Sequence, residues 1–266
     1  MNTLEGKVAI VTGGTGGIGK GIAAQLASRG ATVVISGRNA EKAAAVLDEL
    51  RRSGATVDFV AGDVRSKADM LTLAEETARR HGGIDIIVAN AGGNDNEARS
   101  PEVRGPFASI DLARVAGVVA DNTLAKLYPV QAALPYLRTR GSGSVIFVTS
   151  EGGRVATPGQ TAVSTFAGGL IRASKVIARE LARDRIRVNC VCVTVVRDSP
   201  SWEAVFGEDS RVSEHHRKQY EKIVAGCPLG VAAPDDIGRV VSFLASDESA
   251  YLTGATLSPT GGLTIH

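Results

Sequence analysis

Short apolar runs alternate with helix-like segments along most of this chain. The runs are rich in β-branched residues and predict buried strands at residues 7–12, 31–37, 56–63, 84–93, 144–150 and 186–196. Helical patterns lie between them, at about residues 20–30, 41–52, 67–82, 115–137 and 165–184. Such alternation is typical of parallel strands joined by crossover helices. We therefore predict an α/β fold with a single doubly wound parallel sheet and helices on both faces.

Residues 197–228 interrupt this alternation. The segment is charged and contains Trp202, Phe206 and Tyr220. It predicts an insertion with one or two helices, placed where it covers a ligand crevice. A helical pattern at 233–246 and a short strand near 255–262 follow. With no internal repeat and no clear linker, we predict one domain that spans residues 1–266.

The composition excludes several classes of protein. Of 266 residues, 44% are hydrophobic and 22% charged, which suits a soluble globule with a large core. A net charge of +2 and 4% aromatic residues argue against nucleic-acid binding. We find no apolar run of about 18 residues and no leader peptide, so we expect a cytoplasmic protein away from membranes. Cys190 and Cys192 alternate in one run and predict buried thiols on one strand face, and no metal-ligand spacing is visible.

A glycine-rich turn stands at the first predicted strand-to-helix junction. It reads TGGTGGIG, from Thr12 to Gly19. Glycines there allow a tight turn and a close approach of the backbone to a pyrophosphate, and the helix N-terminus offers free N–H groups to the anion. This context predicts a Rossmann-type dinucleotide-binding domain. We expect the phosphate cradle to consist of Gly13, Thr15, Gly17, Ile18 and Gly19.

The end of the second predicted strand bears on the choice of nucleotide. It reads Ser36-Gly37-Arg38-Asn39, and no carboxylate precedes Glu41. A site that prefers NAD usually has an acidic residue here to bind the ribose hydroxyls, whereas a guanidinium suits a 2′-phosphate. Arg38 therefore predicts NADP(H) as the cofactor. The alternative is a solvated arginine at a strand end.

With these residues the chain resembles the short-chain dehydrogenase/reductase family over nearly its whole length. The family's TGxxxGxG turn, helix asparagine and strand-end serine are similar to Thr12–Gly19, Asn122 and Ser150. Its Asp-Val pair beside the adenine and its NAG segment are matched by Asp63, Val64, Asn90, Ala91 and Gly92. The resemblance implies a nicotinamide-dependent oxidoreductase of a small molecule. It also implies a homo-oligomer, a dimer or tetramer, formed through helices near 112–138 and 163–183.

The chain departs from this family where the chemistry takes place. The resemblance implies a Tyr-x-x-x-Lys pair after the serine, in which the tyrosine transfers the substrate proton and the lysine lowers its pKa and holds the nicotinamide ribose. The matching positions are Val163 and Ala167. The family's Pro-Gly beside the nicotinamide is replaced by Val193-Thr194. We therefore predict an atypical member.

The loss of a tuned acid limits the possible reactions. Ketone reduction without one should lose about 10²–10⁴ in rate, because the alkoxide needs a proton as hydride arrives. Reduction of an activated C=C bond, as in an enoyl thioester, creates an enolate that hydrogen-bond donors can hold. We therefore predict NADPH-dependent reduction of such a bond, with Ser150 as the donor and Asn122 supporting the site.

Two other functions stay open. A dehydratase, isomerase or cyclase could use a polar group of residues 94–97, Glu151, His215 or His216. Each group also has a structural interpretation: residues 94–97 as an ordinary loop, Glu151 as a solvated carboxylate, and the two histidines as part of an exposed helix face. A catalytically inactive NADP(H)-binding partner protein would also keep the nucleotide motifs. Lys126, one turn from Asn122, is either a substitute cation or a solvent-facing lysine.

Overall fold

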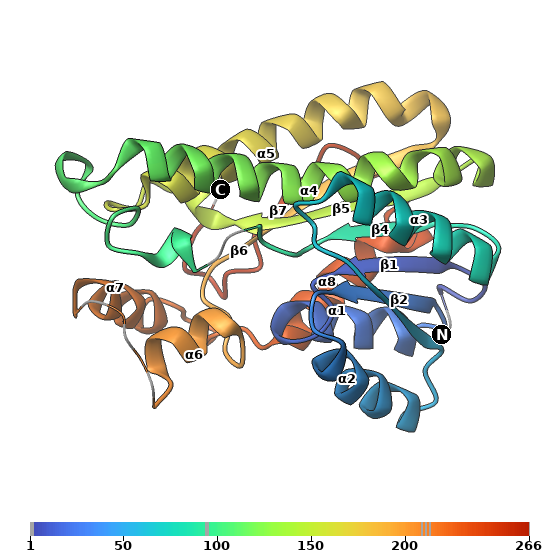
Figure 1. Ribbon diagram of the computed structural model, residues 1–266, viewed down its shortest axis with the longest axis horizontal. Coiled ribbons are helices and arrows are strands. Elements are labelled where there is room, and N and C mark those ends of the chain that lie inside the picture. Colours follow the sequence, from blue (N-terminus) through green and yellow to red (C-terminus); the bar gives the residue numbers. More distant parts are fainter. Residues whose placement is uncertain (1–2, 94–95, 209, 211, 213, 266) are drawn as a thin grey trace.

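A computed structural model describes residues 3–93, 96–208, 210, 212 and 214–265. Within these ranges, seven strands form one parallel sheet in the order β3-β2-β1-β4-β5-β6-β7 (Figure 1). The strands are β1 (Val8–Thr12), β2 (Thr32–Gly37), β3 (Val57–Ala61), β4 (Ile86–Ala89), β5 (Gly143–Ser150), β6 (Ile186–Val193) and β7 (Thr256–Leu257). The predicted fold class is confirmed.

Helices cover both faces of this sheet (Figure 1). One face is covered by α1 (Gly17–Ser28), α2 (Ala40–Arg52) and α8 (Pro234–Ala245). The other face is covered by α3 (Lys67–His81), α4 (Leu112–Arg140) and α5 (Thr161–Leu181). The predicted insertion contains two helices, α6 (Pro200–Phe206) and α7 (Glu214–Ala225). Short 3₁₀ turns are η1 (Glu97–Arg99), η2 (Phe107–Ser109), η3 (Glu151–Gly153), η4 (Ala182–Asp184) and η5 (Asp247–Ser249).

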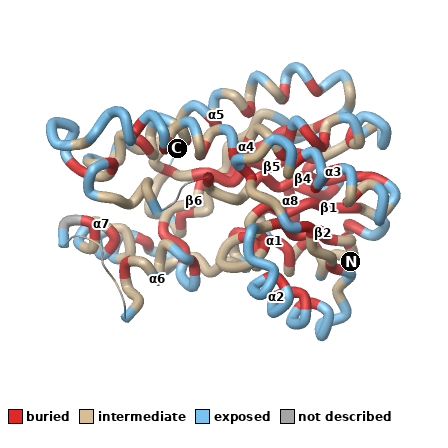
Figure 2. The backbone as a smooth tube through the Cα atoms, viewed as in Figure 1, coloured by how far each residue is buried: buried red, intermediate tan, exposed pale blue. Residues whose placement is uncertain are grey.

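The buried strands divide their side chains between two hydrophobic layers. In β1, Ala9 and Val11 pack with one set of helices, and Ile10 packs with the other. This follows from the two-residue side-chain period of a strand. Cys190 and Cys192 both lie in the layer under α4 and α5, as their spacing predicted. Figure 2 shows the buried residues concentrated on the strands and on the inward faces of the helices.

Three element boundaries differ from the predictions. The helix predicted from residue 115 begins at Leu112, because the Asp111 carboxylate accepts hydrogen bonds from the first-turn N–H groups of Ala113 and Arg114. The helix predicted from residue 165 begins at Thr161. The strand predicted over 84–93 is shorter, ending at Ala89, so the NAG segment follows the strand.

The helices α1 and α8 cross in close contact through two glycines. A Cβ added to Gly21 would lie 2.4 Å from the carbonyl carbon of Pro234, and one added to Gly238 would lie 2.5 Å from the Gly21 carbonyl oxygen. Both obstacles are backbone atoms, which cannot turn aside as a flexible side chain would. Glycine at these positions therefore sets the distance between the two helices.

We expect Gly21→Ala to lower the free energy of unfolding by about 1–3 kcal/mol, because the added methyl group overpacks the helix contact. Chemical denaturation measures this change. The matched control is Gly117→Ala in α4, where no neighbouring heavy atom lies within 4 Å of an added Cβ. That variant should be as stable as the parent chain or more stable by about 0.5–1 kcal/mol. Unchanged stability in Gly21→Ala would contradict the close contact.

Candidate functional site

The predicted site residues gather at the carboxyl edge of the sheet. The strands β1, β4 and β5 are neighbours, and they end at Thr12, Ala89 and Ser150. The glycine turn follows β1, and Asn90, Ala91 and Gly92 follow β4. This edge includes the point where the strand order reverses, between β1 and β4, which is where open α/β sheets bind ligands.

The glycine turn has the geometry that its sequence predicts. Gly13 and Gly17 have positive φ angles of 69° and 47°, a conformation that other residues rarely adopt. A Cβ added to Gly19 would lie only 2.0 Å from the Gly13 carbonyl oxygen. No side chain caps the N-terminus of α1, and no acidic residue stands in its first turn. Gly13, Thr15, Gly17, Ile18 and Gly19 therefore surround a helix N-terminus that favours an anion.

Thr12 joins the glycine turn to the segment after β4. Its buried Oγ1 accepts hydrogen bonds from the N–H groups of Asn90, at 3.0 Å, and Ala91, at 3.2 Å. The Asn90 side-chain amide donates to the Thr12 carbonyl oxygen at 3.1 Å. These bonds fix the distance between the loops that follow β1 and β4 at this edge of the sheet.

Asn122 lies beside this segment and is buried. Its Oδ1 accepts from the Gly93 N–H at 3.2 Å, and its Nδ2 donates to the Val118 carbonyl oxygen at 3.0 Å. The side chain therefore holds the chain that leaves Asn90, Ala91 and Gly92 against α4. This contact suits the supporting role that the sequence predicted for Asn122.

Ser150 and Val163 face the same small space. A Cβ added to Gly152 would lie 3.3 Å from Ser150 Oγ and 3.2 Å from Val163 Cγ1. Ser150 Oγ accepts the Gly152 N–H at 3.1 Å, which leaves its own hydroxyl proton available for donation. Ala167, one turn later on α5, is fully buried against Gly153. The α5 residues at positions 163 and 167 are thus apolar, and the polar group nearest to the added Gly152 Cβ is Gln160 Oε1, at 3.1 Å.

Lys126 is buried, so its interpretation as a solvent-facing lysine was wrong. Only 5% of the residue is exposed, and its ammonium group donates to the Asn90 carbonyl oxygen at 2.5 Å. Spacing along α4 was the missed signal, because Val115, Val118 and Asn122 form a buried stripe that Lys126 continues. The structure thus places a cation at the end of β4, within the candidate site.

Glu151 is also buried, which corrects its interpretation as a solvated carboxylate. Its two oxygens accept hydrogen bonds from the hydroxyls of Ser258, at 2.6 Å, and Thr264, at 3.0 Å. Arg154 donates to the same Ser258 hydroxyl at 2.8 Å. Glu151 therefore fastens the C-terminal segment to η3, next to Ser150.

Two arginines, Arg38 and Arg65, lie after the carboxyl ends of β2 and β3. Arg38 follows β2 and is exposed, and Asp63 and Val64 follow β3. The Arg65 guanidinium binds the Asp63 carboxylate, with a shortest N–O distance of 2.6 Å, and lowers the pKa of Asp63 to about 2. Arg38 adds a weaker electrostatic effect of the same sign. Arg65 was not predicted from the sequence, because its role depends on how the loop after β3 brings it back onto Asp63.

The insertion borders the site from the side opposite the sheet. Ser199 and Pro200, at the start of α6, lie against Gly17 of the glycine turn. On α7, Gln219 donates to the Pro158 carbonyl oxygen at 2.8 Å, just before the segment that leads to Val163. Figure 1 shows both helices together at one end of the molecule.

Two histidines were expected on an exposed face of this insertion. His216 is instead only 3% exposed, and its ring centre lies 5.0 Å from that of Tyr220. The interpretation of His216 as exposed was therefore wrong. The side chain of His215 and the residues Asn94 and Asp95 lie outside the described part of the structure, whereas Asn96 and Glu97 lie at η1.

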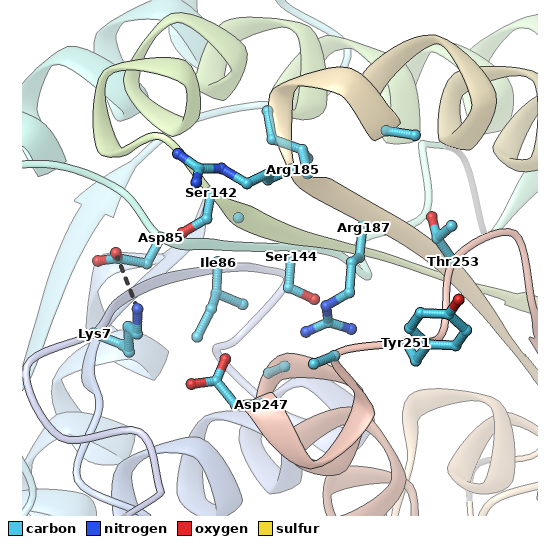
Figure 3. Close-up of a pocket in the computed structure, with 15 residues that line it drawn as sticks. Lys7, Asp85, Ile86, Ser142, Ser144, Arg185, Arg187, Asp247, Tyr251 and Thr253 are labelled. Atoms are coloured by element: carbon cyan, nitrogen blue, oxygen red, sulfur yellow. Dashed lines mark ion pairs between the residues drawn. The ribbon is translucent and has the colours of Figure 1, made fainter.

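A separate pocket of about 590 Å³ lies at the opposite edge of the sheet (Figure 3). It is lined by the first residues of three strands, Ile86, Gly143 and Ile186, so it is remote from the carboxyl ends. The Arg187 guanidinium in this pocket donates to the carbonyl oxygens of Leu244 and Ser246. This arginine holds the end of α8, and the pocket does not contain the predicted site residues.

The structure adds two findings on other kinds of site. Among the described residues, no cluster of three His, Cys, Asp or Glu side chains is arranged to hold a metal ion. The helices in the described part of the chain are too short or too polar to span a membrane.

Comparisons with known proteins agree with this architecture. A family model described as Enoyl-(Acyl carrier protein) reductase matches residues 13–264. The chain is 31% identical to 7alpha-hydroxysteroid dehydrogenase of Bacteroides fragilis, over 100% of this chain and 97% of that protein. It is 32% identical to 3-oxoacyl-(acyl-carrier-protein) reductase FabG of Chlamydia pneumoniae, over 98% of both proteins. A solved 7alpha-hydroxysteroid dehydrogenase, complexed with NADH and 7-oxo glycochenodeoxycholic acid, is similar with a TM-score of 0.85 and 26% identity, over 98% of this chain and 96% of that chain.

Glu151→Ala should lower the free energy of unfolding by about 1–3 kcal/mol, because it leaves the hydroxyls of Ser258 and Thr264 without their acceptor. Chemical denaturation measures the loss. Glu151→Gln keeps one acceptor oxygen and should lose less. The control Glu180→Ala, at an exposed position of α5, should change stability by less than about 0.5 kcal/mol. Equal stability of Glu151→Ala and the parent chain would refute the anchoring role.

Proposed function

The chain belongs to the short-chain dehydrogenase/reductase family of oxidoreductases, and we propose that it uses NADP(H) to reduce an activated C=C bond, such as that of an enoyl thioester. The observation that carries this proposal is the contrast between the two ends of the site. The glycine turn and the segment after β4 follow the family pattern, whereas Ser150 faces Val163 in place of an acid. We also propose that residues 1–266 form one nucleotide-binding domain.

The residues at the carboxyl edge fit a dinucleotide. The uncapped N-terminus of α1 offers its first-turn N–H groups to a pyrophosphate, and Gly13, Thr15, Gly17, Ile18 and Gly19 leave room for it. Asp63 and Val64 would border the adenine, and the NAG segment, Asn90, Ala91 and Gly92, would complete the nucleotide site. When bound, the nucleotide would supply a hydride.

The cation at the end of β2 supports NADP(H) over NAD(H). Arg38 is exposed and forms no ion pair with the described residues, so its guanidinium is available to a 2′-phosphate. Asp63, after the neighbouring strand β3, has an electrostatic interaction with Arg38, but its carboxylate already binds Arg65. A carboxylate in that state is a poor partner for ribose hydroxyls.

The apolar neighbour of Ser150 favours an enolate over an alkoxide. A ketone that accepts hydride becomes a strongly basic alkoxide, and Val163 cannot protonate it. An enoyl thioester that accepts hydride at its β-carbon converts its π electron pair into an enolate, which needs hydrogen-bond donors more than an immediate proton. The Ser150 hydroxyl can donate to the enolate oxygen, and water can protonate the α-carbon. One hydride and one proton thus add across the C=C bond.

Lys126 supports the same chemistry with its charge. Its ammonium group is buried and reaches the Asn90 carbonyl oxygen, at the end of the strand next to β5. A positive charge in a buried site stabilises a developing anion more than it would in water. We propose that Lys126 supplies the cation that Ala167 cannot, from α4 instead of α5, while Asn122 keeps its supporting role.

The names of the relatives point to different substrates. The two curated relatives are named for a hydroxysteroid and a 3-oxoacyl group, and the matching family model is named for an enoyl group. In our proposal, Val163 favours the enoyl group, because valine stands at the position of the acid that carbonyl reduction requires. We further propose that α4 and α5 form the contact of a homo-oligomer and that the protein acts in the cytoplasm.

Arg38→Ala should weaken NADPH binding by about 10–100-fold, the loss expected for a charge-assisted hydrogen bond to phosphate. Fluorescence titration of the purified protein with NADPH, and separately with NADH, measures both affinities. NADH has no 2′-phosphate, so its affinity should not change. Equal affinities of the parent protein for NADPH and NADH would reject the role of Arg38.

Ser150→Ala should lower kcat for reduction of crotonyl-CoA by about 10²–10³, the effect of removing one donor to a developing oxyanion. NADPH oxidation at 340 nm gives the rate, and acetoacetyl-CoA serves as the ketone comparison. The parent protein should reduce crotonyl-CoA faster than acetoacetyl-CoA. Binding of NADPH without turnover of any enoyl thioester would indicate a catalytically inactive nucleotide-binding protein instead.

A further inference from the structure

Two arginines in the segment before α4 lie against the insertion. Arg99 and Arg104 are both half-buried. The Arg99 guanidinium donates to the Ser201 hydroxyl of α6 at 2.9 Å. The guanidinium carbon of Arg104 lies 5.5 Å from the ring centre of Tyr220 on α7. Each arginine therefore bridges the segment to one helix of the insertion.

The acidic residues of the same segment bind a different arginine. Glu97 contacts Arg114 at 2.5 Å, and Glu102 contacts it at 3.4 Å. No ion pair joins Arg99 or Arg104 to a carboxylate among the residues that the structure describes. The segment thus holds two positive charges toward the insertion, whereas the carboxylates of Glu97 and Glu102 bind Arg114 of α4.

The two arginines have polar neighbours on the insertion, but this part of the chain still contains unpaired hydrogen-bond donors. Burial lowers the pKa of Arg104, the hydrogen-bonded Tyr220 side chain opposes this shift, and the nearby charge of Arg99 lowers the pKa further. Arg104 Nε and the hydroxyl of Ser100, whose carbonyl oxygen accepts the Arg104 N–H at 2.8 Å, are buried and have no hydrogen-bond partner in the described part of the chain. A buried charge and buried donors normally find a partner, because losing water without one costs free energy. The pair therefore has the chemistry of an anion site.

The position of the two arginines relates them to the candidate site. Arg99 binds Ser201, two residues after Ser199, which contacts Gly17 of the glycine turn. Beside Arg104, Gly105 lies 3.6 Å from a Cβ added to Gly159, four residues before Val163. The arginines thus occupy the seam between the insertion and the segment before α4, and this seam runs from the glycine turn toward Val163.

We propose that Arg99 and Arg104 bind an anionic group of the substrate, a carboxylate or a phosphate, and so restrict the substrate to acidic molecules. The proposal rests on the proposed function, because it assigns the substrate of the same site. Guanidinium groups suit both anions, since each presents planar N–H donors to two oxygens. An enoyl compound with a second acidic group, or one attached to a phosphorylated carrier, meets this requirement.

Trp202 provides a signal that does not depend on turnover. It is the only tryptophan of the chain, it follows Ser201, and its ring centre lies 4.5 Å from that of Phe206. The experiment titrates the NADP⁺-saturated protein with crotonate, methyl phosphate and the neutral crotonamide at constant ionic strength, and records Trp202 fluorescence. We expect saturable changes with crotonate or methyl phosphate and none with crotonamide. The anion that binds more tightly distinguishes a carboxylate from a phosphate substrate.

Arg99→Gln and Arg104→Gln should each weaken binding of that anion by about tenfold or more, the loss of a charge-assisted contact. Lys218→Gln, which removes an exposed positive charge of α7, is the matched control and should bind as the parent does. If Arg104→Gln fails to fold, Arg99→Gln alone decides, because the Arg99 guanidinium lies over no aromatic ring of the described residues.

Three results would overturn the proposal. The first is that crotonamide binds as tightly as the anions, and the second is that neither anion binds. The third is that the arginine variants lose affinity for NADP⁺ instead of for the anion, which would assign the arginines to the cofactor phosphates. Failure of the proposed function has a different signature. In that case crotonyl-CoA is not reduced, while arginine-dependent binding of the anion persists.

Discussion

The hydroxyl of Thr12 holds together the place where the sheet reverses its strand order. From β1 the chain continues into α1 on one face, and from β4 it leads toward α4 on the other face. Two N–H groups after β4 donate to the buried Thr12 Oγ1, so the loops that diverge here remain at a fixed distance. The contacts of Lys126 with Asn90 and of Asn122 with Gly93 both depend on that arrangement. One buried hydroxyl thus determines where the groups of the crevice can lie.

Much of the fold could be predicted because its signals are local. Runs of β-branched residues such as 186–196 identify buried strands, and the two-residue period correctly assigns Cys190 and Cys192 to one face. Once the strands are known to be parallel, the residues that follow β1, β4 and β5 must meet at one edge. The gathering of the glycine turn, Asn90 and Ser150 follows from this geometry alone.

The environments of the charged residues were harder to predict, because they depend on contacts between distant segments. Glu151 is buried by hydroxyls from residues more than 100 positions later, which no local pattern indicates. His216 is buried against Tyr220 one turn away, and that spacing was present in the sequence but lay within a strongly charged stretch. The local composition suggested that both side chains are exposed, whereas contacts with other residues bury them.

Gly17 meets two separate requirements, one of backbone conformation and one of space beside the insertion. Its φ angle of 47° favours glycine for reasons of backbone geometry. Independently, a Cβ at this position would lie 2.8 Å from Pro200 Cδ and would displace the start of α6. A substitution at Gly17 therefore has two separate costs, one in the backbone of the turn and one in the packing of α6. The insertion is thus anchored at Ser199 and Pro200 to the residue that shapes the turn, so a change in either element shifts the other.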